Sequence, residues 1–307
     1  MTNVTASMVK DLRDKTGAGM MDCKSALNET AGDMEAAIDW LRKKGLSKAA
    51  KKAGRIAAEG LIGIAVGGDA GALVEVNAET DFVARNDQFK DFVKSAAEIA
   101  LKEAGDVEKL LANPMNGGAS VKDTLTHMVA TIGENMSVRR AVALSVNPGV
   151  VSAYVHNASS PELGKIGVLV ALKSTADKAK LQALGKQIAM HVAAAAPLAL
   201  TPEHLSKDIV ERERAIQADI ARQSGKPENV IEKMMEGRMR KFYEESVLMS
   251  QTFVVDGETQ ISKVIENASK DLGAPVTIEG FVRFQVGEGI EKIESDFADE
   301  VSKMAGN

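Results

Sequence analysis

The sequence has little of what several classes of protein require. Its 307 residues contain one cysteine, Cys23, which excludes an internal disulfide framework and a metal cluster made of cysteines alone. Its four histidines are scattered and do not have the spacing of a zinc site. Aromatic residues make up only 4% of the chain, which argues against base stacking as its main mode of action.

Long apolar runs and targeting signals are also missing. The longest apolar runs, 166–172 and 192–200, are much shorter than a membrane span. The N-terminus has no basic stretch followed by an apolar run, so it is not a secretory signal. With 38 basic and 43 acidic residues, the formal net charge is −5. We therefore expect a cytoplasmic protein without a membrane partner.

Common catalytic motifs are absent from the sequence. There is no phosphate-binding loop of the P-loop type, no His-Glu-x-x-His and no Gly-x-Ser-x-Gly. The Gly17-Ala-Gly19 run lacks the third glycine of a dinucleotide-binding motif and joins two helical segments. We therefore expect neither an enzyme nor a bound cofactor or metal. An enzyme with a dispersed site stays an alternative, because catalytic residues can converge from distant positions.

Residues 1–55 have the pattern of a small helical module with a linker. Apolar residues recur at helical spacing over 5–16, 20–30 and 34–44, and glycines follow each segment, the last of them Gly45. The expected core consists of Leu12, Ala26, Leu27, Ile38, Trp40 and Leu41. So small a core is marginal by itself, so we expect support from a partner or from the rest of the chain.

Seven basic residues cluster between residues 42 and 55. One interpretation is contact with nucleic acid, which would make the chain an RNA- or ribosome-associated binding protein. The other is a solvated helical linker. We favour the linker, because the whole chain is acidic and no aromatic residues are interleaved with the basic ones.

From residue 56 the pattern changes to short strands and amphipathic helices. β-Rich runs at 61–66 and 72–76 flank a glycine-rich turn, and helices are expected over 87–101 and 120–132. The order of strand, turn, strand and helix recurs roughly 95 residues later. The second set is expected at 141–146, 150–155, 166–172 and 178–196, with a long turn at 157–164. We predict an α+β fold with a duplicated core, each half an antiparallel sheet with helices on one face.

These patterns give the expected division of the chain. The first core subdomain covers 56–140, and the second covers 141–200 together with 246–288, including a helix at 261–271 and a strand at 276–286. Residues 201–245 interrupt the second unit as two charged helices with a narrow apolar stripe, which predicts a projecting antiparallel hairpin. Residues 289–307 form a C-terminal module with a helix over 290–304.

The most informative stretch is 77–86, between a predicted strand and a predicted helix. Thr80 or Asp81 can cap a short turn and leave Phe82 near its exposed start. In one interpretation Phe82 and Val83 pack under the following helix, and Asp81 merely caps. In the other, the segment is an acidic and aromatic wedge offered to another protein.

The sequence resembles the bacterial translation elongation factor Ts family over essentially the full chain. The resemblance rests on runs such as Thr80-Asp-Phe-Val-Ala-Arg85 and Ile132-Gly-Glu-Asn135. Further matching runs lie at 12–24, 48–54, 139–140, 188–192, 223–227, 236–239 and 286–292. The resemblance implies a ubiquitin-associated-like N-terminal bundle, a duplicated α+β core, an inserted helical hairpin and a C-terminal helix.

The resemblance also implies a function and a partner. Members of the family bind the GTPase elongation factor Tu and accelerate GDP release during peptide-chain elongation. Thr80, Asp81, Phe82 and Val83 match the segment that displaces Mg²⁺ from the nucleotide site. The implied role is that of a nucleotide exchange factor that makes and breaks no bonds itself.

Other partner contacts are implied at separate positions. Arg13, Met20 and Met21 match a contact face of the N-terminal module, and Ile132 with Gly133 matches a loop that supports the wedge. His156 matches a histidine that reaches another domain of the GTPase, although the long turn beside it departs from the shorter forms of the family. No direct contact with nucleic acid is expected. The hairpin's narrow stripe permits a homodimer, or a heterotetramer with the GTPase.

Overall fold

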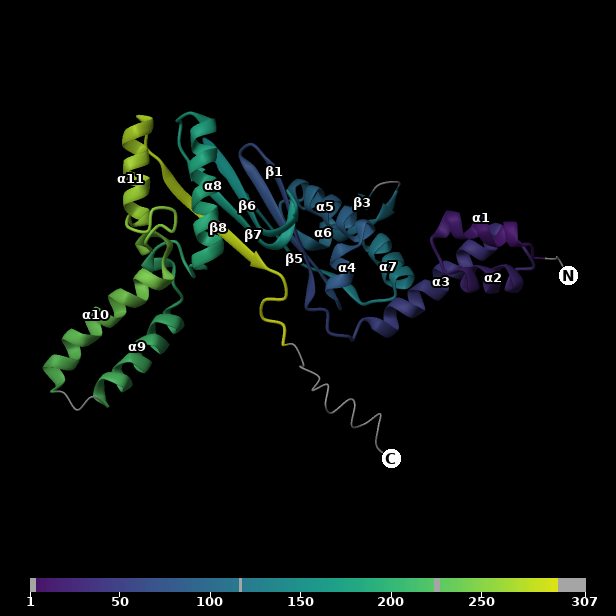
Figure 1. Ribbon diagram of the computed structural model, residues 1–307, viewed down its shortest axis with the longest axis horizontal. Helices are drawn as coiled ribbons and strands as arrows, with labels where there is room; N and C mark the ends of the chain where they lie inside the picture. The colour runs from purple at the N-terminus through teal and green to yellow at the C-terminus, as the bar shows by residue number, and fades with distance from the viewer. Residues whose placement is uncertain (1–3, 116–117, 224–226, 292–307) are drawn as a thin grey trace.

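The computed structural model describes residues 4–115, 118–223 and 227–291 (Figure 1). The protein is an α+β fold of elongated shape, with a helical bundle at one end, a helical hairpin at the other and the strands between them (Figure 1). The C-terminal helix expected over 290–304 falls almost entirely outside the described residues. In the part of the chain that is described, no helix has the length and apolar character needed to cross a membrane. The described residues also contain no group of three or more His, Cys, Asp or Glu side chains that could hold a metal ion.

The N-terminal bundle contains the three helices that the periodicity predicts. These are α1 (Ala6–Thr16), α2 (Met20–Glu29) and α3 (Met34–Lys52). The Thr5 hydroxyl and the Asp33 carboxylate accept hydrogen bonds from backbone N–H groups in the first turns of α1 and α3, as N-caps do. The fully buried core is small: Leu12, Cys23, Ala26, Leu27 and Ala37.

Helix α3 is longer than the sequence predicts. Gly45 was expected to end the helix, but α3 continues to Lys52 and includes most of the basic linker. Gly45 lies against helix α7 (Val121–Ile132), and a Cβ atom at this position would be 3.2 Å from Cβ of Ala130. The glycine therefore permits close helix packing and does not stop the helix. Through this contact the bundle gains the support that its small core requires.

The first half of the core is a three-stranded antiparallel sheet covered by helices. Strands β1 (Glu59–Gly67) and β2 (Ala70–Ala78) form the predicted hairpin, and β5 (Met136–Ser145) pairs with the other edge of β2. Helix α5 (Asp87–Lys102) places its apolar face on this sheet, with Phe89, Phe92 and Val93 buried. The short helix α4 (Asp81–Arg85) lies between β2 and α5, and α6 (Val107–Ala112), β3 (Pro114–Met115) and β4 (Ala119–Ser120) connect α5 to α7.

The second half has the same kind of construction. Strands β6 (Gly149–Ser160), β7 (Leu163–Lys173) and β8 (Thr277–Gln285) form an antiparallel sheet with β7 in the centre. Helices α8 (Lys178–Ala195) and α11 (Ile261–Leu272) cover its outer face, where Leu181 and Ile188 are fully buried. Figure 1 shows α5, α6 and α7 on one side of the strands and α8 and α11 on the other.

The inner faces of the two sheets pack on each other and make a third core. Strands β1 and β7 pair at Ile62–Gly164 and Gly63–Leu163, which joins the two three-stranded halves at a corner into one six-stranded sheet in the order β5-β2-β1-β7-β6, with β8 on β7. A Cβ atom at Gly167 of β7 would lie 2.6 Å from Cγ2 of Ile62. The inter-sheet core contains Ile62, Ile64, Leu73, Val146, Val151, Leu169, Ala171 and Phe284.

Two strand predictions need correction. The strand expected at 141–146 begins at Met136 and belongs to the first sheet, because its backbone pairs with β2. The boundary expected between residues 140 and 141 therefore falls inside β5. The long turn expected at 157–164 is largely strand: β6 runs to Ser160 and β7 starts at Leu163, because Ala158 and Ser160 still pair with Gly164 and Leu163 across a bulge.

The helical hairpin projects as predicted (Figure 1). It consists of α9 (Lys207–Arg222) and α10 (Glu228–Ser246), preceded by a short 3₁₀ turn, η1 (Pro202–His204), and followed by another, η2 (Leu248–Ser250). Ile231 and Met239 of α10 are buried. The isoleucines at 209, 216 and 220, which belong to the narrow apolar stripe of α9, are each more than 40% exposed.

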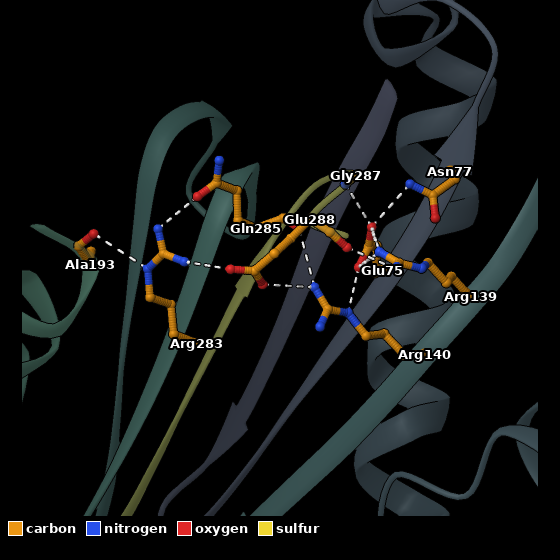
Figure 2. A network of polar contacts seen from close by, with 9 residues as sticks. All are labelled: Glu75, Asn77, Arg139, Arg140, Ala193, Arg283, Gln285, Gly287 and Glu288. Atoms are coloured by element: carbon orange, nitrogen blue, oxygen red, sulfur yellow. Dashed lines mark hydrogen bonds and ion pairs between the residues drawn. The ribbon is translucent and has the colours of Figure 1, made fainter. Parts of the chain in front are cut away.

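A polar network joins the two halves and holds the start of the C-terminal segment (Figure 2). At its centre is Glu75 of β2, which is fully buried. Arg139 and Arg140 of β5 form ion pairs with Glu75 at 3.1 and 2.5 Å, and the Gly287 N–H donates to it at 2.8 Å. The network also contains Asn77, Ala193, Arg283, Gln285 and Glu288. Residues just after β8 are thus fixed to the first half of the core.

Candidate protein-binding site

The segment that the sequence singled out forms a short helix at the end of strand β2. This helix, α4, covers Asp81–Arg85. Phe82 in its first turn is 75% exposed, whereas Val83 and Ala84 are buried in the first core. The interpretation in which both residues pack under the next helix therefore holds for Val83, which is buried, and not for Phe82, which is exposed. Of the two side chains, Phe82 is the one that a partner protein can reach.

The start of α4 is held by a carboxylate from another part of the chain. The backbone N–H of Thr80 donates to Oε2 of Glu134 at 3.0 Å, and the Thr80 hydroxyl donates to Oε1 of the same residue at 2.8 Å. The sequence predicts that Thr80 or Asp81 caps the turn. In the structure α4 has no capping hydrogen bond from a side chain. The Thr80 hydroxyl donates to Glu134, and its oxygen accepts no capping hydrogen bond from α4.

Glu134 belongs to a loop, residues 133–135, that is itself tied to two other elements. Gly133 ends helix α7 with a backbone φ of +93°, a conformation that favours glycine. The Lys52 ammonium of α3 donates to the Gly133 carbonyl. The Asn135 side chain donates to the Arg55 carbonyl at 2.7 Å, and the Asn135 N–H donates to the Glu79 carboxylate. The loop thus connects the linker after α3 with the residues that lead into α4.

The far end of α4 is equally fixed. Asn86 follows the helix and its side chain accepts a hydrogen bond from the N–H of Phe89, which caps α5. The burial of Val83 and Ala84 holds the inner face of α4 against the sheet. A five-residue helix is too short to be stable in isolation. Its conformation is therefore set by these contacts at both ends.

The exposed face of α4 combines a carboxylate, an aromatic ring and a cation. Oδ2 of Asp81 lies 2.6 Å from Nη2 of Arg85, one turn later on the helix. The Arg85 guanidinium carbon lies 5.8 Å from the centre of the Phe82 ring, within the range of a cation–π contact. Arg85 therefore lies beside both side chains of the candidate wedge, and the pair with Asp81 would have to open for that carboxylate to act elsewhere.

The other expected contact residues lie at three places. Met20 and Met21, at the first turn of α2, are 59% and 74% exposed, and Arg13 is exposed near the end of α1. Ile132 and Gly133 lie at the end of α7, beside the Glu134 that holds Thr80. His156 is exposed on β6, where Nδ1 lies 3.2 Å from the Tyr154 hydroxyl. The structure thus brings the loop together with α4, whereas the bundle and β6 contribute separate surfaces.

Several cations of the basic linker already have partners. Lys44 and Lys48 both pair with Asp22, at 3.1 and 2.7 Å, and the hydrogen bond from Lys48 holds the pKa of that carboxyl below its ordinary value despite partial burial. Arg55 pairs with Glu79 at 3.5 Å. Charges engaged in this way are less available to phosphates. The contacts favour the interpretation of 42–55 as a helical linker over that of a nucleic-acid surface.

The sequence did not assign a role to the residues that hold α4. Glu134 lies in one of the matching runs, but a carboxylate directly after a helix-ending glycine has no local signature. Its partner Thr80 is 54 positions away in the chain. The same holds for Glu79 and Asn135, which are 56 positions apart. Only the pairing of β2 with β5 brings these residues together.

Comparison with known proteins gives consistent matches. The family model described as "Elongation factor TS" matches residues 79–288. A protein of Rhodospirillum centenum named "Elongation factor Ts" is 63% identical over 307 residues, covering 100% of both chains. The protein of the same name from Rhodospirillum rubrum is 62% identical over 304 residues, covering 98% of each chain. That of Maricaulis maris is 57% identical over 310 residues, covering 100% of this chain and 99% of its own.

Proposed function

Because the chain belongs to the elongation factor Ts family, we propose that it is the nucleotide exchange factor of the GTPase elongation factor Tu and acts through the wedge Thr80–Val83. The single observation that carries the proposal is the exposure of Phe82 on a helix that is fixed at both ends. The chain catalyses no covalent step. It accelerates GDP release by entering the neighbourhood of the nucleotide and its Mg²⁺.

The chemistry of the partner's site makes such a wedge effective. A Mg²⁺ ion bound to a nucleotide is held by few protein ligands together with phosphate oxygens and waters, and it requires near-ideal octahedral geometry. Displacing one supporting element by about the width of a water molecule removes ligands from that geometry. Phe82 supplies the volume for the displacement. Asp81, released from Arg85, supplies a charge that disturbs the hydrogen bonds around the ion.

The proposal also includes surfaces outside the wedge. Arg13, Met20 and Met21 on the N-terminal bundle and His156 on β6 supply further contacts with the GTPase, and Ile132 with Gly133 supports the wedge from behind. Exchange must be reciprocal: if this protein weakens GDP binding by some factor, GDP weakens the binding of this protein by the same factor. GTP and aminoacyl-tRNA then drive the partner onward.

Release of fluorescent GDP from elongation factor Tu tests the proposal. The wild-type chain is expected to accelerate release, and Phe82→Ala to slow the accelerated rate about tenfold if the ring contributes roughly 1.4 kcal/mol to the transition state. Leu198→Ala removes another exposed apolar side chain and is the matched control, expected to release GDP at the wild-type rate. No acceleration by the wild-type chain, or a normal rate with Phe82→Ala, would contradict the exchange function or the wedge, respectively.

A further inference from the structure

We infer that Glu134 is a positioning residue for nucleotide exchange: its carboxylate fixes the direction in which α4 presents Phe82 to the partner. The inference rests on the proposed function, since it assigns a role in the action of the wedge to a residue outside it. Glu134 is not part of the exposed face of α4. It acts through Thr80, the residue immediately before the helix.

The geometry of the contact is that of a two-point clamp. Both donors of Thr80, the N–H and the hydroxyl, bond to the two oxygens of one carboxylate, at 3.0 and 2.8 Å. Two hydrogen bonds from one residue to one planar group restrict rotation as well as distance, and each is strengthened by the negative charge. The orientation of the peptide that enters α4 is therefore determined by Glu134.

Phe82 needs this external support because it has little of its own. Its ring is 75% exposed, so packing within the chain does not decide where the ring points. The direction of the ring follows from the backbone of α4, which is too short to hold its shape alone. Asn86 and the buried Val83 hold the C-terminal end. Without Glu134 the N-terminal end, where Phe82 lies, would have no equivalent contact from Thr80.

Glu134 is well placed to transmit a fixed position because its own loop is anchored. The Gly133 carbonyl accepts from Lys52 of α3, and Asn135 bonds to both Arg55 and Glu79. These contacts join the wedge to the same helix that carries the N-terminal bundle. A wedge that must displace part of a partner works best when it is rigid before binding, since ordering it during binding would consume part of the interaction energy.

The test compares Glu134→Ala with the conservative change Glu134→Gln in the GDP-release assay, with the full chain and titrated concentrations of each variant. Glu134→Ala is expected to lower the maximal rate about fivefold to tenfold while changing the half-saturating concentration less than about twofold, because the other contact surfaces are unchanged. Glu134→Gln keeps an oxygen that can accept from the Thr80 N–H, so it is expected to recover most of the rate. Glu266→Ala removes an exposed carboxylate of α11, far along the chain from α4, and serves as the matched control with normal exchange.

A second comparison separates positioning from a general structural effect. Thr80→Val removes only the hydroxyl donor, and the double variant Glu134→Ala with Thr80→Val is expected to be no slower than Glu134→Ala alone, because both changes break one clamp. A normal maximal rate with Glu134→Ala, or additive losses in the double variant, would overturn the inference. If Phe82→Ala exchanges normally, the wedge itself fails; if Phe82→Ala is slow and Glu134→Ala is normal, only the role of Glu134 fails.

Discussion

The backbone N–H of Gly287 donates a hydrogen bond of 2.8 Å to Oε1 of Glu75, a residue 212 positions earlier in the chain. Glu75 is a fully buried carboxylate with Arg139 and Arg140 as its cationic partners. Arg140 in turn lies 4.1 Å from the ring centre of Phe284 and donates to the Gln285 carbonyl. This arrangement ties the end of the last described strand to the half of the core that carries α4 (Figure 2).

We predict that Glu75→Gln destabilises the fold by about 1–3 kcal/mol, because it removes the buried carboxylate that pairs with Arg139 and leaves Arg140 only its longer ion pair with Glu288. Urea unfolding at pH 7 measures the difference. Glu266→Gln, which removes an exposed carboxylate between Lys263 and Lys270, is the matched control and is expected to unfold like the wild type. Equal stability of Glu75→Gln and the wild type would mean that the network does not contribute.

A further prediction concerns how the stability difference between the wild type and Glu75→Gln depends on pH. Burial opposes ionisation of Glu75, but the hydrogen bonds from Gly287, Asn77 and Arg140 more than offset it and hold the pKa of the carboxyl below its ordinary value of 4.5. The stabilisation is therefore present above the carboxyl's pKa in the unfolded chain and is lost as the pH falls through its pKa in the folded protein. The stability gap between the wild type and Glu75→Gln should narrow in acid. A gap that widens below pH 4.5 would contradict this sign.

His191 makes the stability of the fold depend on pH in a higher range. It is fully buried, Nε2 lies 2.9 Å from the Gln251 side chain, and Nδ1 accepts from the Val254 N–H. Burial lowers the pKa of His191 below 6.5, against a smaller opposing effect of the Gln251 hydrogen bond. The unfolded chain then takes up the proton first, so stability falls as the pH drops below about 6.5.

His191→Gln is accordingly expected to reduce the loss of unfolding free energy between pH 7.5 and 5.5, measured by denaturant unfolding at both values. His127→Gln, at an exposed histidine, is the control that should keep the wild-type loss. If the two variants lose the same stability between these pH values, burial of His191 is not the cause of the dependence.

The contact between the two sheets predicts a clear difference between two glycines of the second sheet. A Cβ atom at Gly167 would lie 2.6 Å from Ile62 and 3.2 Å from Leu73, so Gly167→Ala forces the sheets apart and should cost about 1–3 kcal/mol. At Gly280 of β8 a Cβ atom meets nothing within 4 Å. Gly280→Ala is therefore expected to be neutral or slightly stabilising. Thermal unfolding distinguishes the two, and a neutral Gly167→Ala would exclude tight packing of the sheets at this point.

Phe89 should matter for the stability of the fold, whereas Phe82 should matter for nucleotide exchange and not for stability. Phe89→Ala removes a fully buried ring and should cost about 3–5 kcal/mol of unfolding free energy. Phe82→Ala removes an exposed ring and should change stability by less than about 0.5 kcal/mol. Urea unfolding of both variants checks this. A large loss of stability with Phe82→Ala would show that the ring is part of the core, and the slowed GDP release expected of that variant would lose its meaning.

Much of the local structure could be predicted because its causes are local. The spacing of Phe89, Phe92 and Val93 along one helix predicts the apolar face of α5. Two β-rich runs around a glycine-rich turn predict the β1–β2 hairpin. The wedge segment was found by a run of matching residues. The prediction that the helix ends before Gly45 was wrong, because the reason for a glycine there is the close approach of Ala130 from another helix.

What the sequence by itself determined, then, is the longer helices and strands and the projecting hairpin, since propensity and periodicity act between residues a few positions apart. Tertiary structure alone decided that β5 completes the first sheet, that the two sheets share an inner core, and that Glu134 and Glu75 hold segments 54 and 212 positions away. Contacts of this kind depend on how separate elements are oriented in space, and a single sequence carries no local signal for that orientation.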